Sequence, residues 1–241
     1  LRELSDGFQY HDEVVGLEPC ISCKGTKYLT DDLVCPMCEG KGEQKKIRRS
    51  HKTMDTPKDE ALIDLLEEHE DGGRVVIYAA YTASIDRVVH LCNTQGWHVI
   101  RVDGRGWSMH LGKLPEGSII PPETDQLKML ETFQNPATSR FDKLAFVGHP
   151  GSAGVGLTLT ASPSIIYFSN DFNAENRIQS EDRIHRAGMD ANRGATIIDL
   201  IHLPSDKYVL DNLKKKRELQ SISLGELDAA LVLDDFETRV T

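Results

Sequence analysis

From residue 55 onward, short apolar runs alternate with segments of helical periodicity. The run RVVIYAAY is nearly unbroken, which is typical of a strand buried on both faces. Strands are predicted at residues 74–81, 97–104, 143–149, 164–170 and 195–201, and helices at residues 57–70, 84–96, 124–135, 175–188 and 206–220. This strict alternation predicts an α/β fold, in which a parallel sheet carries helices on both faces.

In such a sheet, ligands bind at the carboxyl ends of the strands. The residues expected at this edge are Tyr81, Thr82, Asp103 to Arg105, His149 to Gly156, and Asn170 to Asn173. Between residues 105 and 123 the chain contains glycines and prolines without periodicity, which predicts a surface excursion.

Four cysteines near the start of the chain form two short pairs, Cys20-x-x-Cys23 and Cys35-x-x-Cys38. Two such pairs suit tetrahedral thiolate coordination, so a structural zinc site is predicted, with two disulfides as the alternative. The glycines that follow the pairs, Gly25, Gly40 and Gly42, are expected to adopt positive φ angles. Each half resembles the Cys-x-x-Cys-x-Gly-x-Gly repeat of the DnaJ-type cysteine-rich domain, although Lys27 replaces the second glycine of the first half.

The charge balance limits the classes of partner. A net charge of -10 argues against a protein coated in basic residues, but it leaves room for local contacts with nucleic acid. Basic residues gather around the cysteines, where they form either a nucleic-acid contact or a solvated linker: Lys24, Lys27, Lys41, Lys45, Lys46, Arg48 and Arg49. The fifth cysteine, Cys92, is expected to be a small buried apolar residue and not a reactive thiol.

The sequence contains neither a membrane-spanning apolar run nor a secretory signal at its start. We therefore expect a cytoplasmic protein associated with nucleic acid, with no membrane partner.

The predicted helix at residues 175–188 places Gln179, Asp182, Arg183 and Arg186 at three- and four-residue steps, on one face. Guanidinium groups suit a phosphoryl group in transfer, because their charge is permanent and their donors are planar. The alternative is a solvated face with an Asp182 to Arg186 ion pair. The glycine-rich segment at residues 151–160 follows a strand, but no Gly-x-x-x-x-Gly-Lys-Ser/Thr loop occurs in the sequence.

Two segments resemble the Swi/Snf-type branch of the superfamily 2 helicases and translocases. Residues 154–189, GVGLTLTASPSIIYFSNDFNAENRIQSEDRIHRAGM, resemble motifs V and VI, and residues 74–104 resemble the motif IV region. The resemblance extends over residues 56–217 and implies the second of two RecA-like lobes. The compact spacing of the motifs and the segment SNDFNAENR resemble bacterial and bacteriophage members more than eukaryotic remodelling enzymes.

The resemblance also implies roles for individual residues. Arg183 and Arg186 would be arginine fingers at the ATP γ-phosphate, Gln179 and Asp182 would order the ATP-binding cleft between the lobes, and Gly154 and Gly156 would form the motif V turn. Tyr81, Thr82 and Arg105 would lie toward the DNA track. His149 and Pro150 stand where the family has Ser-Thr, so Ser152 or Thr158 is expected to replace the lost phosphate contact. Met189 replaces the closing glutamine of motif VI.

The family holds the ATP phosphates and magnesium with residues of a first lobe, and this sequence contains neither motif. We therefore expect residues 1–15 to be a connector from that lobe, 16–49 a zinc-binding module, 50–217 the second lobe and 218–241 a C-terminal tail. The expected function is the C-terminal half of an ATP-dependent helicase or translocase acting on duplex or forked DNA, inactive by itself. The alternatives are a non-catalytic zinc-containing module that binds nucleic acid or protein, and strand annealing or fork remodelling by the same residues.

Overall fold

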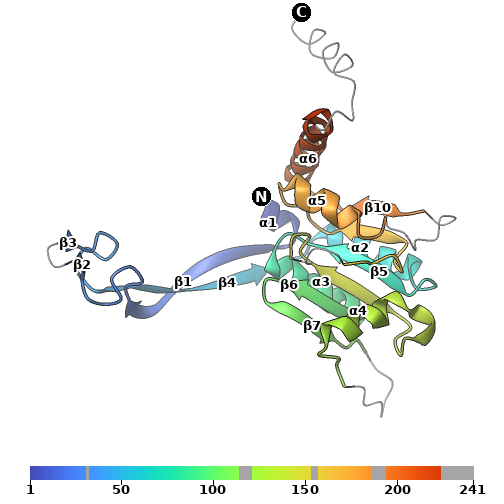
Figure 1. The fold of residues 1–241 in the computed structure, drawn as a ribbon, viewed down its shortest axis with the longest axis horizontal. Helices are drawn as coiled ribbons and strands as arrows, with labels where there is room; N and C mark the ends of the chain where they lie inside the picture. Colours follow the sequence, from blue (N-terminus) through green and yellow to red (C-terminus); the bar gives the residue numbers. More distant parts are fainter. Residues whose placement is uncertain (31–32, 114–120, 153–156, 186–193, 224–241) are drawn as a thin grey trace, which may run out of the picture. The chain divides into compact units, whose positions relative to one another are not determined.

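The structure is a computed structural model that describes residues 1–30, 33–113, 121–152, 157–185 and 194–223 of the chain, with side chains up to residue 219 (Figure 1). The chain forms two compact units. The first, called the lobe, contains Leu1–Gly7 and Asp55–Thr241. The second contains Phe8–Met54 and is called the zinc unit after the zinc site predicted in it.

The lobe is built on a six-stranded sheet with the order β10-β9-β5-β8-β6-β7. Its strands are β5 (Arg74–Tyr78), β6 (His98–Asp103), β7 (Gly106–His110), β8 (Leu144–Gly148), β9 (Ser164–Tyr167) and β10 (Thr196–Asp199). All neighbouring strands pair in parallel except β6 and β7, which are antiparallel. The predicted α/β fold is therefore confirmed.

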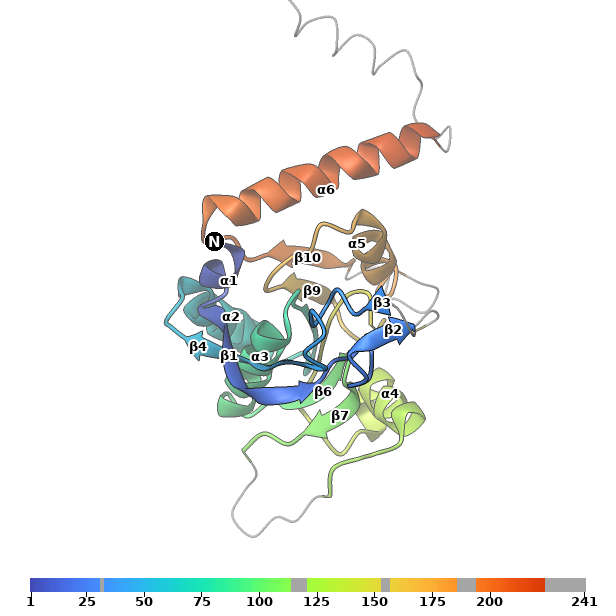
Figure 2. The same ribbon diagram turned by 90° about the vertical axis from the view of Figure 1, so that its left-hand side faces the viewer.

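Helices cover both faces of this sheet. They are α1 (Arg2–Ser5), α2 (Pro57–Glu68), α3 (Thr82–Thr94), α4 (Gln126–Gln134), α5 (Ala174–Glu181) and α6 (Pro204–Ser223), and a short 3-10 helix spans Pro136–Thr138. Figure 2 shows α2 and α3 on one side of the sheet and α4 and α5 on the other. Successive strand residues point to opposite faces, so Val75 and Ile77 pack under α2 and α3, while Val76 and Tyr78 pack toward α4.

Two segments differ from the prediction. The irregular surface segment expected from residue 105 begins instead with β7, an edge strand. Its sequence shows only weak alternation of buried and exposed residues, because Met109 is the one buried residue in it. The helix expected to reach Gly188 ends at Glu181, and Asp182 is its C-cap. The following turn is closed by N–H groups of Arg183 and Ile184 that donate to carbonyls three residues earlier, and it brings Ile184 into the core.

The first residues of the chain are an integral part of the lobe. The buried Lys58 ammonium donates to the Asp6 carboxylate at 2.9 Å and lies 3.0 Å from Asp206 of α6. Ser84 of α3 donates to the other oxygen of Asp6 at 2.5 Å. A buried charge is costly unless it is paired and hydrogen-bonded, and this network meets both conditions for Lys58.

The zinc unit consists of a long antiparallel ribbon and a cysteine-bearing segment. Strand β1 (Phe8–Pro19) pairs with β4 (Glu43–Thr53), and β2 (Tyr28–Thr30) pairs with β3 (Leu33–Val34). The unit is longer at both ends than the module predicted at residues 16–49, because residues 8–15 and 50–53 belong to the paired strands.

Candidate functional site

The four predicted metal ligands come together in the zinc unit. The sulfur atoms of Cys20, Cys23, Cys35 and Cys38 all lie within 4.8 Å of one another, and all four residues are buried. The Sγ atoms of Cys20 and Cys35 are 3.8 Å apart, and those of Cys23 and Cys38 are 3.7 Å apart. A tetrahedron with Zn–S bonds of about 2.3 Å has an edge of about 3.8 Å, so the set could hold a metal ion of this size.

The alternative of two disulfides does not match this geometry. All five cysteines are free thiols, and the separations of 3.7 and 3.8 Å far exceed a sulfur–sulfur bond of about 2.05 Å.

The two cysteine pairs have nearly the same backbone structure. The carbonyl of Cys23 accepts from Thr26 N–H and the carbonyl of Cys38 accepts from Lys41 N–H, both at 2.9 Å. Hydrogen bonds also join the two cysteine-bearing halves to each other. Cys20 N–H donates to the Gly42 carbonyl, and Cys35 N–H donates to the Lys27 carbonyl. The positive φ angles predicted for the glycines are confirmed, at 90° for Gly25, 76° for Gly40 and 82° for Gly42.

Backbone amides aimed at the sulfurs favour thiolates. The N–H groups of Cys38 and Met37 donate to the Cys35 sulfur and lower the pKa of Cys35 to about 6, against the opposing effect of burial. Because a metal binds the thiolate form, this amide arrangement prepares the site for coordination.

In the lobe, several predicted residues gather at the carboxyl ends of the strands. Tyr81, three residues after the end of β5, is the N-cap of α3, and Thr82 begins the helix with an exposed side chain. The Arg2 guanidinium lies 5.2 Å from the Tyr81 ring and 4.9 Å from the Phe172 ring, and it donates to the Asn170 carbonyl. Arg2 was not predicted as a site residue, because nothing in the local sequence indicates this contact.

Arg105, the third residue predicted at the DNA track, is held by two carboxylates. Its guanidinium donates to Asp86 at 2.7 Å and to Asp103 at 2.6 Å. Burial disfavours the Asp103 charge, but the hydrogen bonds from Arg105 outweigh this effect and the pKa of Asp103 lies below its ordinary value. The charge of Arg105 is therefore largely compensated within the lobe.

The turn after β8 contains the substituted His149-Pro150 pair. His149 Nδ1 accepts from Gly151 N–H at 3.1 Å, and its Nε2 lies 3.6 Å from the Asp171 carboxylate after β9. Ser152 is half-buried in the same turn, and its N–H donates to the His149 carbonyl. Thr158 is half-buried and precedes Leu159, whose N–H donates to the Arg183 carbonyl.

The predicted common face of Gln179, Asp182 and Arg183 does not form. Gln179 is exposed and donates to Glu175 at 3.0 Å, and Asp182 is exposed at the end of α5. Arg183 is only 4% exposed, because the turn after α5 directs it into the lobe. There its charge acts on Tyr78, whose pKa is raised by burial and lowered in part by Arg183.

A further set of charged contacts near this edge, made by Arg177, was not predicted. Arg177 of α5 donates to Asp199 and Asn170 at 2.6 Å and to Glu181 at 2.5 Å, and its guanidinium lies 3.5 Å from the centre of the Tyr167 ring. These contacts fix α5 against the ends of β9 and β10. Three residues of the predicted site, Gly154, Gly156 and Arg186, lie outside the described residues, as does Met189.

Comparisons with known proteins identify the family of the lobe. The family model described as "Helicase conserved C-terminal domain" matches residues 57–188, more than half of the chain. The chain therefore belongs to the helicase conserved C-terminal domain family. This result confirms the coarser part of the predicted resemblance, a C-terminal lobe of the Swi/Snf-type superfamily 2 enzymes.

Three similar proteins illustrate the relationship. A human "SWI/SNF-related matrix-associated actin-dependent regulator of chromatin subfamily A member 1" is 23% identical over 151 residues, which cover 63% of this chain and 12% of that protein. The "ATP-dependent helicase fft1" of Schizosaccharomyces pombe is 27% identical over 135 residues, 56% of this chain and 12% of that protein. The "Chromatin-remodeling ATPase INO80" of Cryptococcus neoformans is 25% identical over 174 residues, 71% of this chain and 9% of that protein.

A solved structure shares the fold. The C-terminal part of the Fun30 ATPase domain aligns with a TM-score of 0.50 and 20% identity, covering 66% of this chain and 46% of that one. The chain spans only 9 to 12% of the length of the three relatives named above. These relatives are eukaryotic, so they give no support to the predicted bacterial or bacteriophage likeness. Within the described part of the chain, no helix combines the length and apolar character needed to cross a bilayer.

Proposed function

We propose that this chain is the C-terminal lobe of an ATP-dependent DNA helicase or translocase. The observation that carries the proposal is the family match over residues 57–188, in a sequence that contains motif VI but no phosphate-binding loop. ATP and magnesium would bind between this lobe and a first RecA-like lobe of the same polypeptide. The partner would be DNA, in duplex or forked form.

In this proposal the carboxyl ends of the strands face the ATP-binding cleft between the two lobes. Arg183 and Arg186 would supply positive charge to the transferring phosphoryl group, and we propose the larger share for Arg186 because Arg183 is buried. Gln179, Asp182, Gly154 and Gly156 would line the ATP side of the cleft. Tyr81, Thr82, Ser152 and Thr158 would lie along the DNA track, where Arg105 contributes little net charge because Asp86 and Asp103 bind it.

The metal of the zinc unit is proposed to be structural zinc. Four thiolates fill a tetrahedral zinc site and leave no position for a substrate. The separations of 3.7 and 3.8 Å between sulfurs support this identity. The zinc would then stabilise the fold of the zinc unit and take no direct part in ATP hydrolysis.

The motor role is tested by Arg186→Ala in the full-length protein that contains the first lobe. An arginine at the transferring phosphate contributes roughly 10³ to 10⁵ in rate, so DNA-stimulated ATP hydrolysis should fall by at least about 10³-fold. Nucleotide affinity, measured by equilibrium binding, should change little. The matched control is Arg140→Ala, an arginine on the opposite end of the strands, before β8. ATP turnover near the unsubstituted value in Arg186→Ala would contradict the motor role and favour a non-catalytic binding module.

A further inference from the structure

The two strands of the zinc-unit ribbon carry opposite charge. Strand β1 contains three acidic residues and no lysine or arginine, whereas β4 contains five basic residues and one acidic residue. The acidic residues of β1 are Asp12, Glu13 and Glu18, and the basic residues of β4 are Lys45, Lys46, Arg48, Arg49 and Lys52. The cations lie on both faces of the ribbon, because successive side chains of a strand point to opposite faces: Lys45 and Arg49 share one face, and Lys46, Arg48 and Lys52 share the other.

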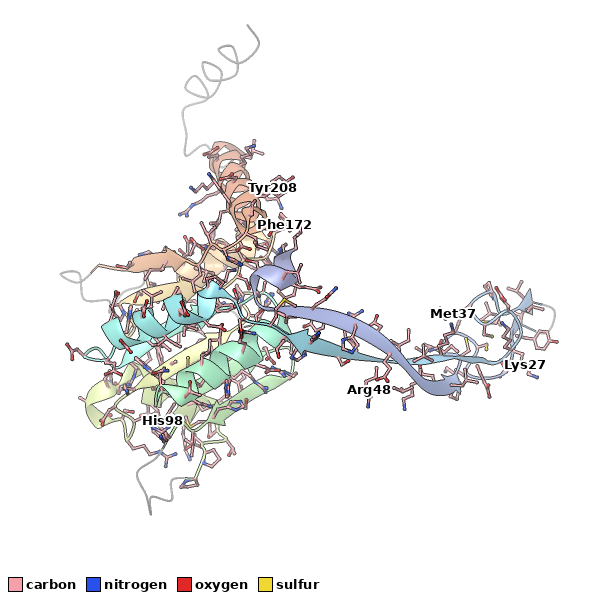
Figure 3. The ribbon with its side chains drawn as sticks, turned by 180° about the vertical axis from the view of Figure 1, so that it is seen from behind. Lys27, Met37, Arg48, His98, Phe172 and Tyr208 are labelled. Carbon is pink, nitrogen blue, oxygen red and sulfur yellow. The ribbon has the colours of Figure 1, made fainter. Side chains whose placement is uncertain are left out.

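The cations of β4 divide into two groups. Arg48 and Arg49 form ion pairs with Glu13 and Asp12 across the ribbon, each at 2.8 Å. Lys45, Lys46 and Lys52 are exposed, and none of them forms an ion pair with a described residue. Figure 3 shows Arg48 on the arm of the ribbon, away from the segment that carries Lys27 and Met37. The three lysines are therefore available to an external anion.

We infer that the β4 edge binds the phosphate backbone of double-stranded DNA, through Lys45, Lys46 and Lys52. This inference rests on the proposed function, which supplies DNA as the partner. A two-stranded ribbon matches the width of the major groove, and lysines and backbone N–H groups are common phosphate ligands. Within the described residues, β4 pairs only with β1, so the N–H groups of its outer edge also face outward.

The length of the strand suits contacts with phosphates on both sides of a DNA groove. From Lys45 to Lys52 the strand rises about 24 Å, at about 3.4 Å per residue. The grooves of B-DNA are about 12 Å and 6 Å wide, so a straight span of this length passes phosphates of both DNA strands, with Lys45 and Lys46 at one end and Lys52 at the other. The three side chains can therefore contact separate phosphates.

A protein partner fits the ribbon less well. Four large apolar side chains on it are exposed, Val14, Val15, Leu17 and Ile47, at 55%, 43%, 66% and 57%. Lysine, however, is depleted in the cores of protein interfaces, and here lysines flank these side chains. The exposed lysines of β4 therefore favour DNA as the occupant.

The test uses the 241-residue chain and a triple variant, Lys45→Gln, Lys46→Gln and Lys52→Gln. A matched control removes three exposed lysines of α6, Lys207→Gln, Lys214→Gln and Lys215→Gln, with the same change in net charge. Binding of a fluorescent duplex of about 20 base pairs is measured by anisotropy over a range of salt concentrations, with sequence-independent phosphate contacts expected to dominate. Metal content and far-UV circular dichroism verify that each variant is folded.

The ribbon variant should bind the duplex at least about tenfold more weakly at 0.1 M salt, and its slope of log K against log salt should fall in magnitude by about 2 to 3. The α6 control should keep the unsubstituted slope. Unchanged binding by the ribbon variant, or an equal loss in both variants, would overturn the ribbon assignment and leave the motor proposal standing. Absence of duplex binding by the unsubstituted chain would also overturn the ribbon assignment, whereas DNA as the partner of the motor is tested separately by the DNA-stimulated ATP hydrolysis of the full-length protein.

Discussion

The lobe and the zinc unit are stabilised in different ways. The lobe buries two apolar clusters of 15 and 14 residues, one on each face of its sheet. In the zinc unit the buried apolar residues are the four clustered cysteines and Phe8. Of the sixteen large apolar side chains that are exposed in the described residues, ten belong to the zinc unit. Burial of apolar surface therefore stabilises the lobe, and in the zinc unit the proposed metal would take its place.

Chain length explains this difference. Short segments cannot remove enough apolar surface from water to offset the loss of conformational entropy, and small natural units add metals or disulfides for this reason. An isolated two-stranded ribbon is also marginally stable in water. The zinc unit, residues Phe8–Met54, has both limitations. Its folding should depend on the metal, while the folding of the lobe should not.

The largest expected effect comes from Cys35→Ser combined with a chelator. Apparent binding free energies of structural zinc are about 10–16 kcal/mol, so loss of the site should unfold the cysteine-bearing segment. Both tryptophans, Trp97 and Trp107, lie in the lobe, so tryptophan fluorescence reports the lobe alone. Metal content should fall to background, while the midpoint of lobe unfolding should stay unchanged.

Cys92→Ser is the matched control for this experiment. Cys92 is fully buried in an apolar cluster of the lobe, where burial raises the pKa of its thiol. A hydroxyl at this position should lower the free energy of unfolding of the lobe by about 1–3 kcal/mol and leave the metal content unchanged. If Cys35→Ser lowers lobe stability as much as Cys92→Ser does, the two units do not fold independently, and the lobe also depends on the metal.

A core substitution tests whether burial of apolar side chains stabilises the lobe. Phe146 of β8 is fully buried, and its ring lies 6.0 Å from the rings of both Trp107 and Phe133. Phe146→Ala should lower the free energy of unfolding of the lobe by about 3–5 kcal/mol, measured by tryptophan fluorescence in urea. Phe172→Ala removes a ring that is 39% exposed and should cost about 1 kcal/mol. Both variants should retain the metal, and metal loss in Phe146→Ala would show that the lobe supports the zinc unit.

Much of the lobe could be predicted because its strands are nearly continuous apolar runs between capped helices. β7 was missed because it is an edge strand with one buried residue and a glycine at its start. The end of α5 was missed for another reason. Helical periodicity continues beyond Glu181, but Glu181 is held by Arg177 and Arg217, and Ile184 enters the core. Such tertiary contacts are absent from the local pattern.

The two candidate sites also differ in how far the sequence predicts them. The cysteine site could be predicted from spacing because the ligands of each pair are fixed by a few adjacent residues. The strand-end site depends on contacts between distant segments, such as Arg2 with Tyr81 and Arg105 with Asp86. Sequence spacing gives no information about these pairs, so it could not predict that Arg105 is neutralised or that Arg183 is buried.

The smallest expected effect concerns Lys27, which replaces the second glycine of the first cysteine repeat. Lys27 has a φ of 74°, close to the 82° of Gly42 at the equivalent position of the second repeat. A left-handed conformation costs a residue with a side chain about 1–2 kcal/mol, and glycine recovers this cost at the expense of about 0.5–1 kcal/mol of extra entropy in the unfolded chain. Lys27→Gly should therefore raise the free energy of unfolding of the zinc unit by up to about 1 kcal/mol.

Competition with a chelator measures this effect as a slightly higher metal affinity of the Lys27→Gly chain. Lys41→Gly is the control, because Lys41 lies between Gly40 and Gly42 and has no positive φ. Glycine there should lower the metal affinity, since it adds entropy to the unfolded chain without relieving strain. Equal changes in the two variants would mean that loss of a lysine charge, and not backbone conformation, determines the stability of the metal site.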